Sequence, residues 1–511
     1  MQNNDKKVLL RISNLKQYFP LKGGRFVKAN DGITLDIYEG ETFGLVGESG
    51  CGKSTLGRTI LQLYHQTYGR TMYYGRSLDD LAPKYVIDTV KNLKARRTKL
   101  RELEQKRDKL EADYAKLSEK EQYAKHGELD TARKLAEDAL LDITKIVGGF
   151  LVVDDLDPVI AAYSKDYAIA RKLSSMEEKR QELLVDVDDA EYAKKAAEEA
   201  GKSGKDGQLQ KAQEKLKQCD DQIAALRAQL DAGRKEIEAL RAPYENDPEF
   251  QKYEAYRDDG IDLARLEYNE MRRLRRDMQL IFQDPYSSLN PRMSVGQIIS
   301  EGMQAHNMIK KKDARMQEMV LKIMDDCGLA PYFLHRFPHQ FSGGQRQRIG
   351  IARALATKPK FVVCDEAVSA LDVSIQAQII NLLLDLKEQQ NLTYMFITHD
   401  LSVVKYISDR VGVMYLGTMV ELAAADEIFH HPIHPYTEAL LNAIPTTDTV
   451  GAKELSILEG DIPSPVNPPK GCKFHTRCKY CTEICTQVVP EWEEVRPNHF
   501  VACHHKLEAK E

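Results

Sequence analysis

The sequence contains no run of 18 or more consecutive apolar residues. A helix needs about 20 such residues to cross a bilayer, so we expect no membrane-spanning segment. The first residues, MQNNDKKVLLRISNL, lack the apolar stretch and small-residue cleavage site of a signal peptide, and we therefore expect a cytoplasmic chain. The formal net charge is −5, and the sequence has no block of basic residues. Both features argue against nucleic acid as the main partner.

A disulfide framework is missing as well. Of nine cysteines, Cys51, Cys219, Cys327 and Cys364 are scattered, and five cluster after residue 470. Small secreted domains use closely spaced cysteine pairs throughout the chain. This distribution instead predicts reduced cytosolic thiols and a candidate metal site near the C-terminus.

The composition divides the chain of 511 residues into three regions. Residues 1–81 and 271–445 have the short apolar runs and Gly turns of one globular domain, split in two. Residues 82–270 are rich in Lys, Glu, Ala, Leu and Arg, as long helices are. Residues 446–511 contain a Pro-rich joint, DIPSPVNPPKG, and the cysteine cluster, and we expect them to form a C-terminal extension.

Apolar residues of the middle region repeat every seven positions, which favours pairing of amphipathic helices. The repeats are Leu103, Leu110 and Leu117, and then Leu209, Leu216, Ile223, Leu230 and Ile237. We expect one antiparallel coiled-coil hairpin, with the apolar segment 145–163 near its tip and the break GKSGKDG (201–207) dividing the returning arm. Phe150 to Val153 would make that tip a docking surface; an exposed spacer, or packing within the tip itself, is the alternative.

The strongest motif is GESGCGKS at 47–54, which follows the strand-like TFGLV and precedes a predicted helix. Glycines allow successive backbone N–H groups to face one anion, and the helix N-terminus adds positive potential. Lys53 is then within reach of the β- and γ-phosphates, and Ser54 supplies a hydroxyl to Mg²⁺. The predicted loop residues are Gly47, Glu48, Ser49, Gly50, Cys51, Gly52, Lys53, Ser54 and Thr55.

An acidic pair, Asp365 and Glu366, follows the apolar strand FVVC. A carboxylate at the end of a strand can hold Mg²⁺, and its neighbour can activate the attacking water. We therefore predict Asp365 as a magnesium ligand and Glu366 as the catalytic base of phosphoanhydride hydrolysis.

Further motifs make the chain resemble the ABC ATPases. FSGGQR at 341–346 resembles their signature motif, SALD at 369–372 their D-loop, IFQDP their Q-loop and ITHD their switch histidine. The resemblance implies an α/β fold, an ABC-type P-loop domain with a RecA-like core and a helical subdomain. It assigns Gln283 to magnesium and catalysis, His399 to catalysis, and Tyr18 (or Phe19) to stacking on adenine.

The same resemblance implies a pair of ATPase subunits arranged head to tail. Each ATP would lie between the phosphate loop of one subunit and Ser342, Gly343, Gly344 and Gln345 of the other, with Asp372 of the D-loop nearby. A helix N-terminus with exposed glycine N–H groups suits the γ-phosphate. ATP and Mg²⁺ are the implied ligands.

Longer stretches, including QDPYSSLNPRMSVGQII and DEAVSALDVSIQAQIINLL, resemble the oligopeptide and dipeptide permease branch, and within it the second ATPase (OppF or DppF type). This implies a heterodimer with another ATPase, two transmembrane permease subunits, an extracellular binding protein, and a peripheral position on the cytoplasmic face of the membrane. Two departures stand out: Ala367 replaces the usual proline, and relatives have only a short helical piece where residues 82–270 lie.

Cys472, Cys478, Cys485 and Cys503 have the spacing C-x5-C-x6-C-x17-C. In the permease branch this pattern resembles the ligand set of a 4Fe–4S cluster. By count the thiolates suit zinc equally, Cys481 is able to replace one ligand, and free thiols are the remaining alternative.

The sequence argues against two other function classes. Chromosome-maintenance and DNA-repair ATPases also carry coiled coils, but theirs resemble an interruption after the Q-loop and have a CxxC apex, both absent here. Ribosome-associated ABC factors fuse two ATPase heads, whereas this chain has one phosphate loop. Transport is therefore favoured, with peptides as the expected cargo and nickel, opines or sugars as alternatives that the sequence leaves open.

Overall fold

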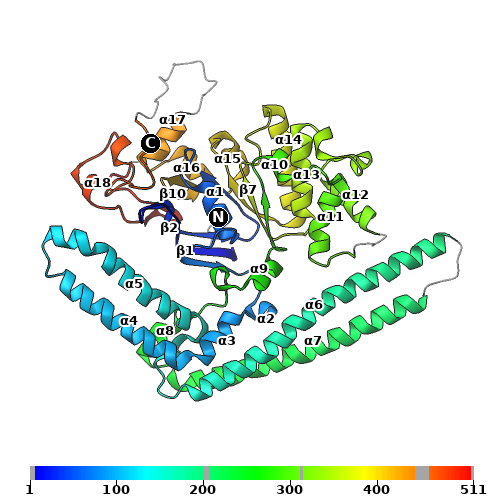
Figure 1. Cartoon of the computed structure of the whole chain (residues 1–511), viewed down its shortest axis with the longest axis horizontal. Helices are drawn as coiled ribbons and strands as arrows, with labels where there is room; N and C mark the ends of the chain where they lie inside the picture. The colour runs from blue at the N-terminus through cyan, green and yellow to red at the C-terminus, as the bar shows by residue number, and fades with distance from the viewer. Residues whose placement is uncertain (1–5, 201–205, 311–314, 444–459, 508–511) are drawn as a thin grey trace. The chain divides into compact units, whose positions relative to one another are not determined.

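The computed structural model describes residues 6–200, 206–310, 315–443 and 460–507. The chain forms two compact units, one of residues 1–75 and 271–511 and one of residues 76–270 (Figure 1). The insert thus begins at Arg76, six residues before the predicted residue 82. The predicted boundary at 445/446 and residues 201–205 of the predicted break lie outside the described residues.

The first unit is built around a large sheet with the strand order β11-β12-β10-β9-β3-β8-β7-β6. From β9 to β6 the neighbours pair in parallel, and β10, β12 and β11 continue the sheet in antiparallel fashion. Parallel strands are covered on both faces and so read as continuous apolar runs; β3, β7 and β8 are buried throughout. The bounds are β3 (Thr42–Val46), β6 (Met278–Ile281), β7 (Phe361–Asp365), β8 (Thr393–Ile397), β9 (Arg410–Tyr415), β10 (Thr418–Ala424), β11 (Glu493–Arg496) and β12 (His499–Val501).

Three further strands of this unit pair in the order β2-β1-β4. They are β1 (Val8–Pro20), β2 (Phe26–Tyr38) and β4 (Tyr68–Tyr73). Both pairings are antiparallel, and residues at alternate positions of β2, namely Ile33, Leu35 and Ile37, are buried. This alternation of buried and more exposed side chains is typical of antiparallel strands.

Helices pack on the large sheet through one apolar core that includes Ile298, Met324, Ile349, Ile379 and Phe396. No helix in the described part of the chain is long and apolar enough to cross a membrane. The helices of this unit are α1 (Lys53–Ile60), α10 (Pro285–Ser288), α11 (Val295–Ala305), α12 (Met316–Asp326), α13 (Gly343–Leu355), α14 (Val373–Gln390), α15 (Leu401–Ile407), α16 (Ala425–His430), α17 (Pro435–Asn442) and α18 (Glu483–Gln487), and α9 (Tyr268–Leu274) spans the boundary.

The cysteine-rich extension is part of this unit and not a separate domain. Its strand β12 pairs with β10, and β11 pairs with β12. Its Phe474 is 2% exposed and packs edge-on against Tyr415, with Tyr436 also in contact. The extension is therefore held by both backbone pairing and buried aromatic contacts.

The second unit consists mainly of two antiparallel helix pairs, α4 with α5 and α6 with α7 (Figure 1). Two ion pairs show the antiparallel direction of the second pair: Lys165, early in α6, contacts Glu236, late in α7, and Arg180, further along α6, contacts Asp220, nearer the start of α7. The bounds in this unit are α2 (Leu78–Leu81), α3 (Lys84–Lys91), α4 (Leu93–Tyr114), α5 (Glu119–Val147), α6 (Asp157–Glu199), α7 (Asp206–Arg241), α8 (Pro248–Glu254) and β5 (Ile261–Asp262).

The expected single hairpin is thus wrong, and the apolar segment 145–163 is not a tip. It lies where α5 ends and α6 begins, and Phe150 is 1% exposed. The physical reason is the pair Gly148–Gly149, which brings the backbone close to α8: a Cβ on Gly149 would lie 2.5 Å from Phe250 Cγ. With Phe150 and Leu151 inside the core of the insert, the docking surface inferred from an exposed tip is excluded.

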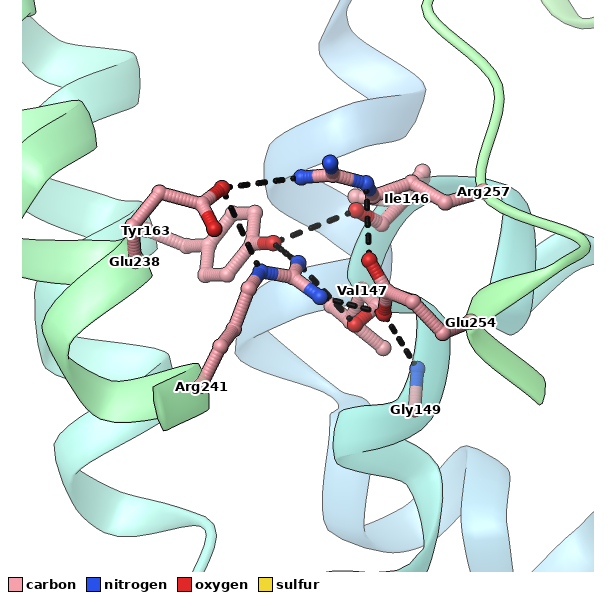
Figure 2. A network of polar contacts seen from close by, with 8 residues as sticks. All are labelled: Ile146, Val147, Gly149, Tyr163, Glu238, Arg241, Glu254 and Arg257. Carbon is pink, nitrogen blue, oxygen red and sulfur yellow. Dashed lines mark hydrogen bonds and ion pairs between the residues drawn. The ribbon is translucent and has the colours of Figure 1, made fainter. Parts of the chain in front are cut away.

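A buried polar network surrounds this segment (Figure 2). Arg241, at the end of α7, is 3% exposed. Its guanidinium donates to Glu254, to the Tyr163 hydroxyl at 2.6 Å and to the Val147 carbonyl at 3.4 Å, and lies 4.5 Å from the Phe150 ring centre. Glu254 also accepts from Gly149 N at 2.9 Å. These contacts hold the end of α5, the start of α6 and the end of α7 together with α8, and so connect the two helix pairs.

The heptad residues of α7 do contact α6. Ile223 and Leu230 are buried, and Leu216 and Leu226 partly buried, in a cluster with Leu173 of α6. One apolar stripe on each helix therefore explains the second helix pair.

Candidate functional site

The phosphate loop connects β3 to α1, which begins at Lys53. Gly47 and Gly52 have φ angles of 147° and 103°, in the region that favours glycine. A Cβ would lie 2.2 Å from the Met414 carbonyl oxygen at Gly47 and 2.1 Å from that of Ala29 at Gly52. These two glycines are therefore required for the loop to close against β9 and β2.

Lys53 is 4% exposed and points into the loop. Its Nζ donates to the carbonyl oxygens of Gly47 at 2.7 Å and Glu48 at 3.0 Å. Burial raises the pKa of Cys51, although Lys53 opposes the rise. Ser49 and Gly50 are exposed at the rim of the loop, and Thr55 lies in the first turn of α1.

Ser54 and Asp365 meet directly. The Ser54 hydroxyl donates to Asp365 Oδ1 at 2.5 Å, and Arg58 of α1 pairs with Oδ2 at 3.1 Å. Asp365 is the last residue of β7 and is 1% exposed. A hydroxyl and a carboxylate are the oxygen donors that Mg²⁺ prefers, so both predicted ligands fit that ion.

Glu366 is the centre of a second contact group. Its carboxylate accepts from Gln283 Nε2 at 2.6 Å and lies 3.4 Å from His399 Nδ1. The three residues follow β7, β6 and β8, whose carboxyl ends meet at one edge of the parallel sheet. Glu366 itself has a φ of 48°, a left-handed conformation that costs about 1–3 kcal/mol in a non-glycine residue and is concentrated at functional sites.

The predicted signature residues stand at the N-terminus of α13. Ser342 caps the helix: its Oγ accepts from Gln345 N at 3.4 Å, and Gln345 Oε1 accepts from Ser342 N at 3.1 Å. Ser342 and Gly343 are exposed, whereas Gly344 packs closely on Ile375 of α14. Asp372 precedes α14 and is exposed. The exposed residues of the predicted signature motif thus stand at the first turn of this helix.

Tyr18 lies near the end of β1 beside Asp31. Its hydroxyl donates to Asp31 Oδ1 at 2.5 Å, and its ring contacts Tyr68 edge-on. Phe19, the alternative, packs edge-on against Tyr64. Burial works against ionisation of Asp31, but Lys473 and the Tyr18 hydroxyl keep its pKa below the ordinary value.

Two cations of the extension, which were not among the predicted site residues, contact the phosphate loop and the Tyr18–Asp31 pair. Arg477 donates to both carboxylate oxygens of Glu48, at 2.7 and 3.0 Å, and this hydrogen bonding raises its pKa. Lys473 donates to Asp31 Oδ2 at 3.2 Å and to the Leu416 carbonyl at 3.1 Å. Both lie among the cysteines, and their partners Glu48 and Asp31 are more than 400 positions earlier in the chain, so no local pattern indicates these contacts.

The four predicted cysteine ligands gather in the extension. Burial raises the pKa of Cys472 to about 11, and the neighbouring Cys485 and Cys478 add to the rise. Burial likewise raises the pKa of Cys503 to about 12. However, no three His, Cys, Asp or Glu side chains within the described ranges are arranged to hold a metal ion. The predicted cluster gains no support from this geometry, and no step is assigned to it.

Comparison with known proteins decides the family. The family described as ABC transporter matches residues 30–240 and 251–369. The chain belongs to the ABC transporter family. The region described as the C-terminal region of oligopeptide/dipeptide transporters matches residues 420–485. The predicted ABC ATPase fold and ATP hydrolysis as its reaction are thereby confirmed.

Relatives within the ABC transporter family differ in how much of the chain they match. The oligopeptide transport ATP-binding protein AppF of Bacillus subtilis is 52% identical over 250 residues, 48% of this chain and 75% of its own length. A putative peptide import ATP-binding protein of Brucella ovis is 54% identical over 245 residues, 48% of this chain and 77% of its own. The putative oligopeptide transport ATP-binding protein YkfD of Bacillus subtilis is 34% identical over 498 residues, 97% of this chain and 95% of its own.

The match to YkfD is long enough that it must run through the inserted second unit. The insert is therefore shared with at least one family member, which corrects the expectation that relatives have only a short helical piece there. The chromosome-maintenance and ribosome-associated alternatives are not favoured, because the C-terminal match and these relatives are those of transporters.

Proposed function

We propose that this chain is the ATP-hydrolysing subunit that energises a membrane importer of oligopeptides or dipeptides. The observation that supports this reaction is the contact group around Glu366, whose carboxylate contacts Gln283 and His399. The Ser54–Asp365 pair lies at the same strand end, because Asp365 directly precedes Glu366. The peptide cargo is supported by the C-terminal match and by the names of the relatives.

In this proposal Glu366 is the general base. It takes the proton of the attacking water, while Gln283 and His399 orient its two carboxylate oxygens. Ser54, Asp365 and Gln283 would hold Mg²⁺, which supplies positive charge against the phosphate oxygens when bound. Lys53 exchanges its two backbone acceptors for phosphate oxygens, and Tyr18 or Phe19 contacts the adenine.

The assembly is proposed from the same family properties. Ser342 to Gln345, at the exposed end of α13, would complete the ATP site of a second ATPase subunit, with Asp372 at that interface. Two permease subunits and an extracellular binding protein would complete the importer, with this chain on the cytoplasmic face of the membrane. The four-cysteine ligand set also stays a proposal; iron, sulfide and zinc analysis of protein purified without oxygen is the measurement that decides it.

Glu366→Gln tests the reaction. Loss of the base should lower ATP turnover by about a hundredfold or more while ATP binding persists. The assay uses the reconstituted importer, and Glu388→Gln, the same chemical change on the exposed side of α14, is the control. Turnover near the wild-type rate in Glu366→Gln would refute the assignment.

The cargo is tested in the same vesicles by adding peptides, nickel or sugars with the cognate binding protein. Peptides should stimulate ATP hydrolysis by the wild-type importer and should not stimulate hydrolysis by the Glu366→Gln importer. Stimulation by nickel or a sugar, with none by peptides, would replace the proposed cargo and leave the ATPase role standing.

A further inference from the structure

We infer that the C-terminal extension positions the ATP-binding loops, with Arg477 and Lys473 as its two positioning residues. The inference rests on the proposed function, because it names residues that act on the same ATP site. If the extension had a purely structural role, its cysteines alone would account for that role. By this inference the extension also acts on ATP binding.

The first contact acts on the phosphate loop. Arg477 has a side chain that is 4% exposed, and it holds both oxygens of Glu48. The backbone N–H of Glu48 donates to the Tyr436 hydroxyl at 2.9 Å. The Glu48 carbonyl accepts from Lys53, the lysine that must reach phosphate. A bidentate Arg–carboxylate pair fixes direction as well as distance, so Arg477 sets the position of the residue on which Lys53 rests.

The second contact acts on the adenine side. Lys473 donates a hydrogen bond to one carboxylate oxygen of Asp31, and the Tyr18 hydroxyl donates to the other. Asp31 N donates to the Gly417 carbonyl at 2.8 Å, and Gly417 N donates to the Cys51 carbonyl at 2.9 Å. The turn between β9 and β10 therefore links the adenine side to the phosphate loop, and Lys473 contacts this turn at Leu416.

Both cations come from one short segment of the extension. Phe474, between them, is buried among Tyr415 and Tyr436, and Lys28 N donates to the Pro465 carbonyl at 3.2 Å just before that segment. Fewer contacts would be enough to attach the extension to the first unit. The two charged contacts act on two parts of one ligand site, the phosphate loop and the adenine side, and the buried Phe474 lies between them in the chain. Because they hold the loops before ATP arrives, they lower the ordering cost of binding.

The test measures ATP affinity directly on the full-length chain with a fluorescent ATP analogue. Arg477→Gln should weaken binding by about tenfold, since a preorganised loop is lost, and Glu48→Gln should do the same. The double variant should be no weaker than either single one, because the two residues act through one contact. Arg477→Lys should recover only part of the affinity, because an ammonium cannot replace the bidentate geometry.

A steady-state assay of the reconstituted importer then separates positioning from catalysis. Arg477→Gln should raise KM for ATP with kcat nearly unchanged. Arg496→Gln is the matched control: it lies on β11 of the same extension and pairs only loosely with Glu427, at 3.7 Å. It should leave both constants unchanged.

The outcomes distinguish this inference from the proposed function. Lys53→Ala should abolish ATP binding in any case; if the wild-type chain binds no ATP at all, the proposed function itself fails. If the wild-type chain binds ATP and Arg477→Gln binds it equally well, the extension has only a structural role. Additive losses in Arg477→Gln and Glu48→Gln would also overturn the inference, because they would show independent effects.

Discussion

His434 shows how a single buried side chain links the fold to pH. It is 1% exposed, and its Nδ1 accepts from Tyr436 N at 3.0 Å at the start of α17. Burial lowers its pKa from 6.5 to about 4. The native histidine therefore stays neutral in a pH range where the unfolded chain takes up a proton.

The sign of the effect follows from this difference. Above pH 6.5 both states are neutral, and as pH falls towards 4 only the unfolded state gains the proton, so stability is lost. We expect wild type to lose about 2 kcal/mol more than His434→Asn between pH 7 and pH 5. Asparagine preserves an N-cap acceptor for α17.

Urea denaturation followed by the fluorescence of Trp492, the one tryptophan of the sequence, measures this difference. Trp492 stacks on Phe500 of β12, at a centroid distance of 6.0 Å, and so reports on the first unit. Equal losses of stability in the two proteins would contradict the assignment to His434.

At the scale of elements, a mutation can test whether residues 148–153 are buried between α5 and α6, as the structure has them. Phe150→Ala removes a ring that packs edge-on against Phe250 and Tyr163. Loss of a buried phenylalanine typically costs about 3–5 kcal/mol, and the helical signal of the insert should melt at a lower temperature. Circular dichroism of the full chain measures it.

Leu135→Ala is the control for that experiment, because Leu135 lies on α5 and is 45% exposed. It should change stability by no more than about 0.5 kcal/mol. If Phe150→Ala had an equally small effect, the segment would be exposed after all, as the docking hypothesis required.

How much of each element could be predicted depends on whether its signal is local. The phosphate loop, the acidic pair and the helix cap at Ser342 are contiguous patterns with a physical requirement at each position, and the structure places them at strand or helix ends. The turn at 115–118 also has a local signal, the capping pattern Ser-Glu-Lys-Glu that begins at Ser118, which the prediction of a single hairpin did not include.

The contacts of Arg477 and Lys473 had no such signal. Arg477 meets a residue 429 positions earlier, and Lys473 one that is 442 positions earlier. The pairing of β12 with β10 and the burial of Phe474 bring these segments together, and neither contact leaves a local pattern in the sequence. The same holds for Arg58, whose ion pair with Asp365 joins a helix to a distant strand.

At the scale of the whole molecule, the insert should be removable. Lys84, near its beginning, hydrogen-bonds to Glu267 and Glu270 near its end, so its two ends are close together. Replacement of residues 84–268 by a short Gly/Ser linker should leave ATP affinity within about threefold, since long loops are thermodynamically cheap to shorten or extend. No predicted ATP-site residue lies in the deleted range.

Fluorescent-nucleotide binding checks that outcome, and uptake by the reconstituted importer, with α4–α5 or α6–α7 removed separately, shows which helix pair contributes to transport. A folded deletion protein that fails to bind ATP would show that the insert supports the site. Unchanged uptake in every deletion would identify the insert as a spacer.

The position of β3 between β8 and β9 has a consequence for synthesis on the ribosome. Thr42 of β3 pairs with Tyr394 of β8, which is made about 350 residues later. At 5–20 residues per second, that is a wait of roughly 20 to 70 s. Meanwhile the insert, whose helices contact their sequence neighbours, is complete and able to fold. The central strand of the ATPase is thus among the first segments made and among the last to find its partners, and the nascent chain must keep a strand that is buried in the folded protein from aggregating until then.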